Sequence, residues 1–272
     1  MIRAKKSFGQ NWLVDETVVA KIIEAAEIVP GETVLEIGPG TGVLTQALVD
    51  AGAHVIAVEA DKSLIAPLRE TFGEFVEVIH ADILSFDFST SATFPPSHLP
   101  TPYKLVANIP YNITSDVLRR FLTTDPKPSR IILMVQREVA DRIVAVPPDM
   151  SLLSVMCQLY AQCRRVTKVP AGAFRPIPKV DSAVVQLDLQ TDVAHARADR
   201  SLHEVNPEDV IAMAKRGFAS RRKQLHGNLK SLTHDSEQIK QALESLGLPS
   251  SARAQELTVE KWVKLTHILN KN

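Results

Sequence analysis

The sequence predicts an α/β domain followed by a small all-helical domain. Short apolar runs alternate with segments in which apolar residues recur every three or four positions, a pattern typical of a parallel sheet covered by helices on both faces. A glycine-rich turn directly follows the first long apolar run, and the pattern beyond residue 205 is helical. We therefore expect one domain over residues 1–195 and another over 205–272.

The elements of the first domain follow in a regular order. Helical spacing of apolar residues behind Asp15, a residue suited to an N-cap, predicts a helix over 15–28. Strands are expected at 33–37, 54–58, 75–79, 104–107 and 130–136, alternating with helices near 41–51, 61–72, 114–123 and 137–145. A helix over 152–161 follows, and strands at 164–169 and 182–189 would form an antiparallel hairpin at one sheet edge.

Two segments lack a regular pattern. Serines and prolines indicate a surface loop over 85–103, and the stretch 190–206 is polar and aperiodic. In the second domain, helices are expected near 207–218, 221–232, 236–246 and 258–270.

Composition excludes several classes of protein. With 272 residues, of which 45% are hydrophobic and 23% charged, the chain has the material for a large core, and it is neither disordered nor collagen-like. No run approaches ~18 apolar residues and residues 1–15 hold no leader core, so we expect no membrane association and a cytoplasmic location. Cys157 and Cys163 lack a flanking His pair, so we expect buried thiols and no metal site.

Charge is unevenly distributed although the net charge is zero. Residues 16–118 hold 4 basic and 14 acidic residues, which leaves 27 and 17 for the rest of the chain. The basic residues gather in three runs: Arg3, Lys5 and Lys6; Arg164, Arg165, Lys168, Arg175 and Lys179; and Lys215, Arg216, Arg221, Arg222, Lys223 and Lys230. This asymmetry indicates a polyanionic partner, although solvated helix faces would explain any single run.

A glycine turn indicates a cofactor site. Gly38, Gly40 and Gly42 follow the first strand, where glycines let a ligand approach the backbone closely. Glu59 ends the next strand, where a carboxylate can accept hydrogen bonds from both ribose hydroxyls. Asp82, just beyond the third strand, is placed to accept from an adenine amino group.

A site for a nicotinamide dinucleotide would have the same glycine turn and the same acidic residue after the second strand. The spacing of the glycines distinguishes the two kinds of site. The dinucleotide fingerprint G-x-G-x-x-G requires glycine at position 43, which is Val43, and it does not call for Glu36 ahead of the turn. The combination instead resembles the S-adenosylmethionine (AdoMet) site of class I methyltransferases.

The fourth strand ends in Asn108-Ile-Pro-Tyr111, which indicates a second site. A purine's exocyclic amine is a poor nucleophile because its lone pair is delocalised into the ring. The Asn108 amide oxygen and the Pro110 carbonyl can each accept one N–H and so direct that lone pair toward a methyl group. Tyr111 can stack on the base, a contact worth roughly 1–3 kcal/mol.

These motifs resemble the ribosomal RNA adenine dimethyltransferase family over nearly the whole chain. The matching segments are KKSFGQNWL from Lys5, Glu36 to Gly42, Glu59, Asp82, Asn108 to Tyr111, LMVQREVADR from Leu133 and FRPIPKVDS from Phe174. The resemblance implies a class I (Rossmann-like) AdoMet-dependent methyltransferase sheet with a small C-terminal all-helical domain. It implies cofactor contacts from Asn11, Leu13, Glu36, Gly38, Gly40, Glu59, Asp82 and Asn108, and catalytic roles for Asn108, Pro110, Tyr111 and Phe174, with Phe174 facing Tyr111 across the adenine.

Three features favour the small-subunit (16S rRNA, KsgA-type) branch: the full FRPIPKVDSAVV segment, the FASRRKQLHGNL stretch and the helical tail. Two positions depart from the family pattern, Trp12 and the pair Met150-Ser151. The expected activity is dimethylation of two adjacent adenosines near the 3′ end of small-subunit rRNA within an assembling ribosomal particle, by a monomer. A large-subunit rRNA methyltransferase and a non-catalytic rRNA-binding assembly factor are the alternatives.

Arg221, Arg222 and Lys223 are the expected RNA contacts. They follow Ser220, which would cap a helix whose Leu225 and Leu229 face a core and leave the basic heads in solvent. Such a cluster would bind RNA phosphates. The alternative is that these side chains pair with acids such as Glu237 or Glu244.

Overall fold

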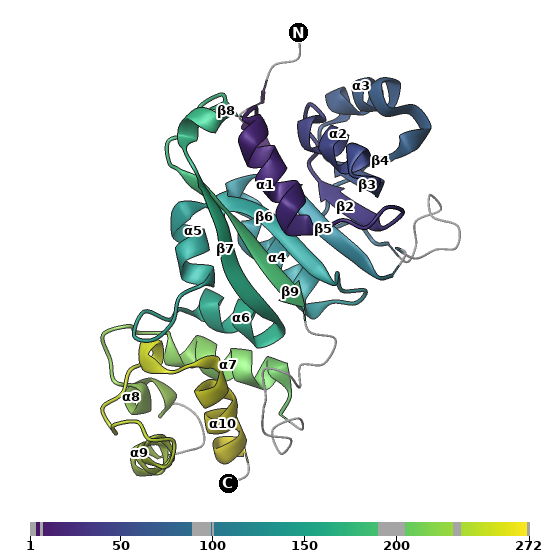
Figure 1. The fold of residues 1–272 in the computed structure, drawn as a ribbon. Helices are drawn as coiled ribbons and strands as arrows, with labels where there is room; N and C mark the ends of the chain where they lie inside the picture. The colour runs from purple at the N-terminus through teal and green to yellow at the C-terminus, as the bar shows by residue number, and fades with distance from the viewer. Residues whose placement is uncertain are drawn as a thin grey trace. The chain divides into compact units, whose positions relative to one another are not determined.

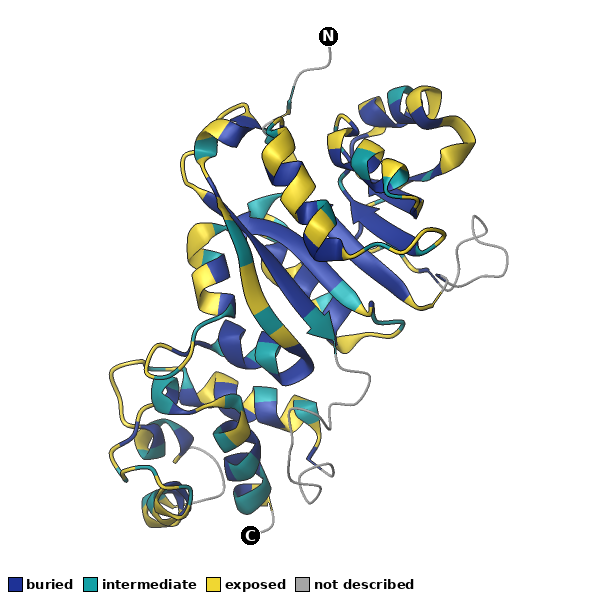
Figure 2. Ribbon diagram, viewed as in Figure 1, coloured by how far each residue is buried: buried dark blue, intermediate teal, exposed yellow. Residues whose placement is uncertain are grey.

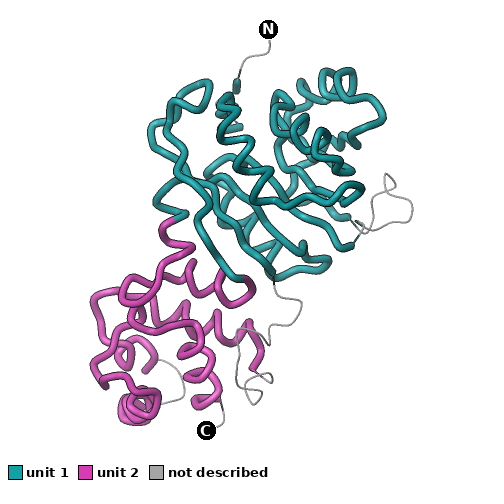
Figure 3. Tube along the Cα trace, in the orientation of Figure 1, with its two compact units in different colours: residues 1–140, 162–189 teal, residues 141–161, 190–272 magenta. Residues whose placement is uncertain are grey.

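The structure is a computed structural model that describes residues 4–5, 8–88, 99, 101–189, 205–230 and 235–270. It divides into two compact units, residues 1–140 with 162–189 and residues 141–161 with 190–272 (Figure 3). Residues 141–161 therefore group with the C-terminal helices, whereas the sequence pattern assigns them to the first domain. The expected boundary at 195–205 lies almost wholly outside the described residues.

A seven-stranded sheet forms the centre of the first unit (Figure 1). Its strands are β2 (Thr33–Ile37), β3 (His54–Glu59), β4 (Val76–His80), β5 (Tyr103–Asn108), β6 (Arg130–Gln136), β7 (Ala161–Val169) and β9 (Ser182–Leu189). They lie in the order β4-β3-β2-β5-β6-β9-β7. The neighbours from β4 to β6 pair in parallel, and β9 pairs antiparallel with β6. All seven strands are among those predicted from the sequence.

A smaller sheet was not predicted. β1 (Trp12–Leu13) and β8 (Phe174–Arg175) pair antiparallel, with Leu13 opposite Phe174. Strands of two residues carry no alternation that a sequence pattern can reveal. This pairing attaches the N-terminal segment to the loop that precedes β9.

The helices of the first unit are α1 (Glu16–Ala26), α2 (Val43–Asp50), α3 (Lys62–Phe72) and α4 (Thr114–Thr123), and α5 (Arg137–Ile143) begins there. Short 3-10 turns lie at Gly73–Phe75, Tyr111–Ile113 (η3) and Ala171–Ala173. Helices α1 and α4 lie on opposite faces of the sheet (Figure 1). Asp15 caps α1 as predicted, because its carboxylate accepts from Thr17 N–H at 2.9 Å.

The central strands are buried on both faces, as Figure 2 shows. Every residue of β2 is buried, including the charged Glu36. This double burial explains why the strands read as continuous apolar runs rather than as alternating ones.

Helix α2 begins two residues later than predicted because Gly42 has a left-handed backbone, with φ of 85°. A Cβ at this position would lie 2.7 Å from Phe72 Cε2. Gly42 therefore serves close packing of α2 on α3 as well as the turn itself.

The strand order places a crevice between β2 and β5. From β2 the chain proceeds outward through β3 and β4, and it then returns to add β5 and β6 on the other side. Ligands of doubly wound sheets bind at this reversal, outside the carboxyl ends of the strands.

The second unit consists of α6 (Leu152–Tyr160), α7 (Pro207–Gly217), α8 (Leu225–Leu229), α9 (Ser236–Ser245) and α10 (Val259–Asn270), with a 3-10 turn at Ala254–Glu256. Ser151, one of the departures from the family pattern, caps α6. Its Oγ accepts from Ser154 N–H at 3.2 Å while Ser154 Oγ accepts from Ser151 N–H at 2.9 Å. In the part of the chain that the structure describes, no helix is both long and apolar enough to cross a membrane.

The helix predicted over 221–232 is present but shorter at its start, because α8 runs from Leu225 to Leu229, and residues 231–232 lie outside the described residues. Lys223 N–H donates to Ser220 O at 3.2 Å, so these residues close a turn, and Ser220 caps no helix. The Asn228 amide donates to Ser220 O at 3.0 Å and to Gly217 O at 2.6 Å, and it thereby holds the turn against α8.

Candidate active site

A cleft lies at the carboxyl ends of β2, β3, β4 and β5. This is the place where small ligands bind in open α/β sheets. The predicted site residues that line it are Asn11, Leu13, Glu36, Gly38, Gly40, Glu59, Asp82, Asn108, Pro110 and Tyr111. Residues from five separate segments of the chain therefore meet where the strand order reverses.

Glu59, at the end of β3, is held by backbone amides. Its Oε1 accepts from Asp61 N–H at 2.7 Å, and its Oε2 accepts from Gly40 N–H at 3.3 Å. Burial raises the pKa of Glu59, and these amide hydrogen bonds oppose the shift in part. Because each carboxylate oxygen has two lone pairs, the side chain can still accept from a pair of ligand hydroxyls.

The glycine turn also packs against the N-terminal segment. Gly40 has φ of 59°, and a Cβ there would lie 3.1 Å from Trp12 Cδ1. The indole of Trp12 thus lies directly on the turn, and Trp12 itself lines the cleft. Any side chain at position 40 would displace this wall.

Glu36 places an unpaired acceptor at the cleft. The residue is 1% exposed, and its Oε2 has no hydrogen-bond partner among the described residues. Burial raises the pKa of Glu36 to about 8, which the neighbouring Thr45 hydroxyl opposes only in part. A buried carboxylate without a cationic partner is costly, so the position suits a ligand that brings positive charge.

Asn108, at the end of β5, has a defined amide orientation. Its Nδ2 donates to the backbone carbonyl of Asn11 at 3.1 Å. Because that carbonyl can only accept, the amide nitrogen must face it, and Oδ1 is left as an acceptor at the cleft.

Pro110 and Tyr111 continue the same turn. The Pro110 carbonyl accepts from Ile113 N–H at 3.2 Å within η3, which leaves it one further lone pair. Tyr111 is half-buried, and its hydroxyl lies 2.6 Å from Ser182 Oγ. The turn therefore presents two acceptors and one aromatic ring to the cleft.

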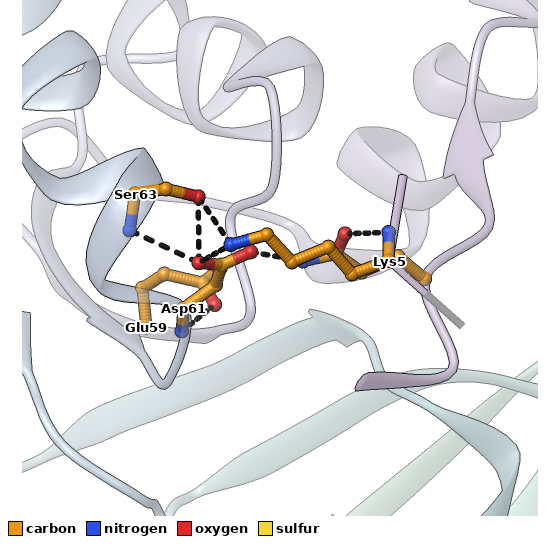
Figure 4. A network of polar contacts seen from close by, with 5 residues as sticks. Lys5, Glu59, Asp61 and Ser63 are labelled. Carbon is orange, nitrogen blue, oxygen red and sulfur yellow. Dashed lines mark hydrogen bonds and ion pairs between the residues drawn. The ribbon is translucent and has the colours of Figure 1, made fainter. Parts of the chain in front are cut away.

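The N-terminal strap, which we define as Lys5 and residues 8–13, is tied beside Glu59 (Figure 4). Lys5 Nζ lies 2.7 Å from both Asp61 Oδ1 and Ser63 Oγ, and Gln10 Nε2 donates to Asp61 Oδ2 at 3.1 Å. Burial alone would raise the pKa of Asp61, but the hydrogen bonds from Lys5, Ser63 and Gln10 hold it well below its usual range. The sequence pattern did not reveal this network, although Lys5 lies within a recognised motif and Asp61 follows Glu59 by two residues.

Asp82 lies just beyond the end of β4 and is exposed, and its Oδ1 accepts from Leu84 N–H at 2.9 Å. Arg120 of α4 holds the segment that follows. Its guanidinium donates to Ile83 O at 2.6 Å and also to Phe86 O. The segment that carries Asp82 and Ile83 is thus held in place by a half-buried cation.

Comparison with known proteins assigns this architecture to a family. The model of the family described as ribosomal RNA adenine dimethylase matches residues 1–271. The chain belongs to this family. It is therefore a methyltransferase, and the predicted Rossmann-like class is confirmed.

Individual dimethylase relatives match along nearly the whole chain. The protein named ribosomal RNA small subunit methyltransferase A of Thermosynechococcus vestitus is 44% identical over 278 residues, which cover 99% of this chain and 98% of that protein. The structure of the 23S rRNA methyltransferase ErmE is 28% identical, with a TM-score of 0.75 and coverage of 96% and 100%. A dimethyladenosine transferase from Plasmodium falciparum is 26% identical, with a TM-score of 0.77 and coverage of 95% and 97%.

Phe174 is not among the residues that line the cleft of this dimethylase. It is 0% exposed and packs within the hydrophobic core together with Leu13, its partner in the β1–β8 pair. The expected arrangement, in which Phe174 faces Tyr111 across an adenine, is therefore not what this geometry presents. The apolar pairing of β1 with β8 draws the ring inward.

Arg221, Arg222 and Lys223 lie exposed in the turn before α8. Among the residues that the structure describes, no ion pair involves them, and Glu237 pairs instead with Lys240 at 3.4 Å. Their charges are therefore open to solvent. The described residues also include no group of three His, Cys, Asp or Glu side chains placed to hold a metal ion.

Proposed function

We propose that this dimethylase transfers methyl groups from AdoMet to the exocyclic N6 of two adjacent adenosines near the 3′ end of small-subunit rRNA. The observation that carries the proposal is the juxtaposition of two sites in one cleft. At the carboxyl end of β5, Asn108 and Pro110 present acceptors and Tyr111 presents its ring. Beside the glycine turn lie the carboxylates of Glu36 and Glu59.

The residues of the cleft fit AdoMet. Glu59 can accept from two ribose hydroxyls, and the unpaired Oε2 of Glu36 suits the ligand's positive charge. Asp82 is placed to accept from the adenine amino group, and Gly38, where a Cβ would meet no atom within 4 Å, leaves the backbone open to close approach. When bound, AdoMet supplies a methyl group on a sulfonium, which is already an activated leaving group.

The chain's own contribution is to position the target amine. Asn108 Oδ1 and the free lone pair of the Pro110 carbonyl would each accept one N–H, which directs the nitrogen lone pair toward the methyl donor. The bond from Asn108 Nδ2 to Asn11 O holds the amide in this orientation before any substrate arrives. Tyr111 would stack on the extruded base and offset part of the unstacking cost.

The basic turn would hold RNA. Arg221, Arg222 and Lys223 are exposed and unpaired within the described part of the chain, so they are suited to phosphate contacts that position a structured RNA. We propose that the substrate is rRNA within an assembling small-subunit particle in the cytoplasm, and that the enzyme acts as a monomer.

One experiment tests both reaction and substrate class. Small-subunit particles, free rRNA and large-subunit rRNA are each incubated with the protein and labelled AdoMet, and their nucleosides are analysed by mass spectrometry. We expect dimethyladenosine from the particles alone. Product from large-subunit rRNA would instead support the branch to which ErmE belongs, and binding of particles without any product would indicate a non-catalytic assembly factor.

A further inference from the structure

The hydroxyl groups of Tyr111 and Ser182 lie 2.6 Å apart, although the two residues come from distant segments of the chain. Tyr111 opens η3 after β5, and Ser182 is the first residue of β9. The proposed chemistry makes no use of Ser182, which does not line the cleft. A buried hydroxyl aimed at the tip of the stacking tyrosine nevertheless acts on the orientation of that ring.

Ser182 is a rigid anchor. It is 0% exposed and pairs with Gln136 in the register between β6 and β9. The preceding residue is fixed as well, because Asp181 O accepts from Arg137 N–H at 3.0 Å and Asp181 Oδ1 accepts from Ala171 N–H at 3.1 Å. The position of Ser182 Oγ is therefore set by the sheet and not by the cleft.

Tyr111 needs such an anchor. Its ring lines the cleft and is only half-buried, so packing against protein does not enclose it. Burial raises the pKa of Tyr111, and the hydrogen bond with Ser182 offsets only part of that shift, so the phenol stays neutral at physiological pH. The backbone of η3 holds one end of the neutral ring, and Ser182 holds the other.

We propose that Ser182 is a positioning residue that holds the ring of Tyr111 at the angle required to stack on the target adenine. The inference rests on the proposed function, since it presumes that an adenine enters the cleft. It assigns Ser182 no contact with the substrate. The effect is pre-organisation, because a ring that is already held loses less freedom when the base stacks on it.

A double-mutant cycle tests the role. Ser182→Ala removes the anchor, and Tyr111→Phe keeps the stacking ring but removes its hydroxyl. We expect each variant to lose roughly threefold to tenfold in kcat/KM for the RNA, as release of one immobilised side chain predicts, with AdoMet affinity unchanged. The double variant should lose no more than either single variant, because both changes break the same bond.

Matched controls come from a second tyrosine and a second serine. The Tyr103 hydroxyl donates to Pro126 O at 2.8 Å, and Ser129 Oγ donates to Tyr103 O at 3.1 Å, both away from the cleft. Tyr103→Phe and Ser129→Ala should lower the melting temperature without lowering kcat/KM. Additive losses in the double-mutant cycle, or a fully active Ser182→Ala, would overturn the positioning role.

A spectroscopic measurement observes the hydrogen bond directly. The chain has 3 tyrosines, so carbon-13 labelling of the ring carbon that bears the hydroxyl gives a spectrum that Tyr111→Phe assigns. In Ser182→Ala we expect only the Tyr111 resonance to move. If the chemical shift of Tyr111 is the same in Ser182→Ala as in the wild type, Ser182 does not anchor the ring. If the chemical shift changes but kcat/KM for the RNA does not, the anchor has no positioning role. If the wild-type protein forms no dimethyladenosine, the proposed function itself is wrong. That outcome differs from both results above, which concern only the role of Ser182.

Discussion

The side-chain amide of Asn108 donates a hydrogen bond of 3.1 Å to the backbone carbonyl of Asn11. This bond connects the tip of β5, where the target amine would be held, to the N-terminal strap. The same strap is tied through Lys5 and Gln10 to Asp61, whose backbone amide holds Glu59. One short segment therefore links the two ends of the cleft.

Replacement of Asn108 tests the amine-orienting site. Asn108→Ala should cut turnover by roughly 10²-fold or more while AdoMet affinity stays within a few-fold, because the missing acceptor matters most in the transition state. Single-turnover methylation and calorimetry measure the two effects separately. Asn112→Ala is the matched control, since Asn112 is exposed on η3 and does not line the cleft. A near-normal rate in Asn108→Ala would contradict the role.

Most residues of this cleft could be predicted from the sequence because each of them lies close in the chain to the end of a predicted strand. An unbroken apolar run predicts a strand buried on both faces, and in a parallel sheet the residue that follows each strand must lie at the same edge. Gly38, Glu59, Asp82 and Asn108 could therefore be placed together without knowledge of any contact between them.

The features that were missed depend on tertiary packing. Phe174 resembles a stacking residue in its motif, but its pairing with Leu13 carries it into the core, and no local pattern encodes that pairing. The late start of α8 depends on Asn228, which holds the preceding turn. The link between Ser182 and Tyr111 spans 71 residues and joins two polar side chains that no periodicity relates.

Glu59 should dominate cofactor affinity. Glu59→Ala leaves two ribose hydroxyls without their acceptor, at a cost of roughly 1.5–3 kcal/mol for charge-assisted hydrogen bonds, so AdoMet affinity should fall at least tenfold. Calorimetric titration measures the change. Glu70→Ala removes an exposed carboxylate of α3 and should have no effect. Equal affinities in the two variants would remove Glu59 from the site.

Glu36 should make AdoMet binding dependent on pH. Because burial raises the pKa of Glu36 to about 8, the carboxyl is largely protonated at pH 7, and a cationic ligand must displace that proton. The ratio of AdoMet affinities, wild type over Glu36→Gln, should rise between pH 6.5 and 8 and stay constant at higher pH. The comparison cancels the titration of the ligand's own amine, and an identical pH profile in the two proteins would contradict the assignment.

The raised pKa of Glu36 should also make the stability of the ligand-free protein depend on pH. A carboxyl whose pKa rises from 4.5 to about 8 on folding keeps its proton in the native state, so the ligand-free protein loses stability as pH increases through that interval. Glu36→Gln should therefore raise the melting temperature more at pH 9 than at pH 5. Thermal denaturation at the two pH values without AdoMet measures the difference, and an equal effect at both would argue against a protonated Glu36.

Lys5 should stabilise the strap over bound cofactor. Lys5→Gln removes the ion pair with Asp61, and because the lysine is 44% exposed the loss should be modest, about twofold to fivefold in AdoMet affinity. The dissociation rate should rise by a similar factor, which stopped-flow displacement measures. Lys62→Gln, an exposed lysine next to Asp61 in sequence, is the control. If both variants release AdoMet equally fast, the strap does not depend on Lys5.

The basic turn before α8 should control RNA affinity without affecting the cofactor. Arg221, Arg222 and Lys223 are exposed and pair with no acid among the described residues, so their replacement leaves no buried charge behind. Changing all three to Glu should weaken binding of small-subunit particles steeply and flatten its salt dependence by about one unit of slope for each phosphate that the turn no longer binds.

Particle binding at two salt concentrations, together with AdoMet titration and thermal denaturation, separates RNA binding from a structural role. We expect unchanged AdoMet affinity and an unchanged melting temperature, because the turn is held by Asn228 and not by the basic heads. Arg222→Glu should show a smaller loss of the same kind, and Lys62→Glu, which makes the same charge change on α3 in the acidic segment, should show none. A lower melting temperature with an unaltered salt slope would instead mean that the three side chains stabilise the helical unit.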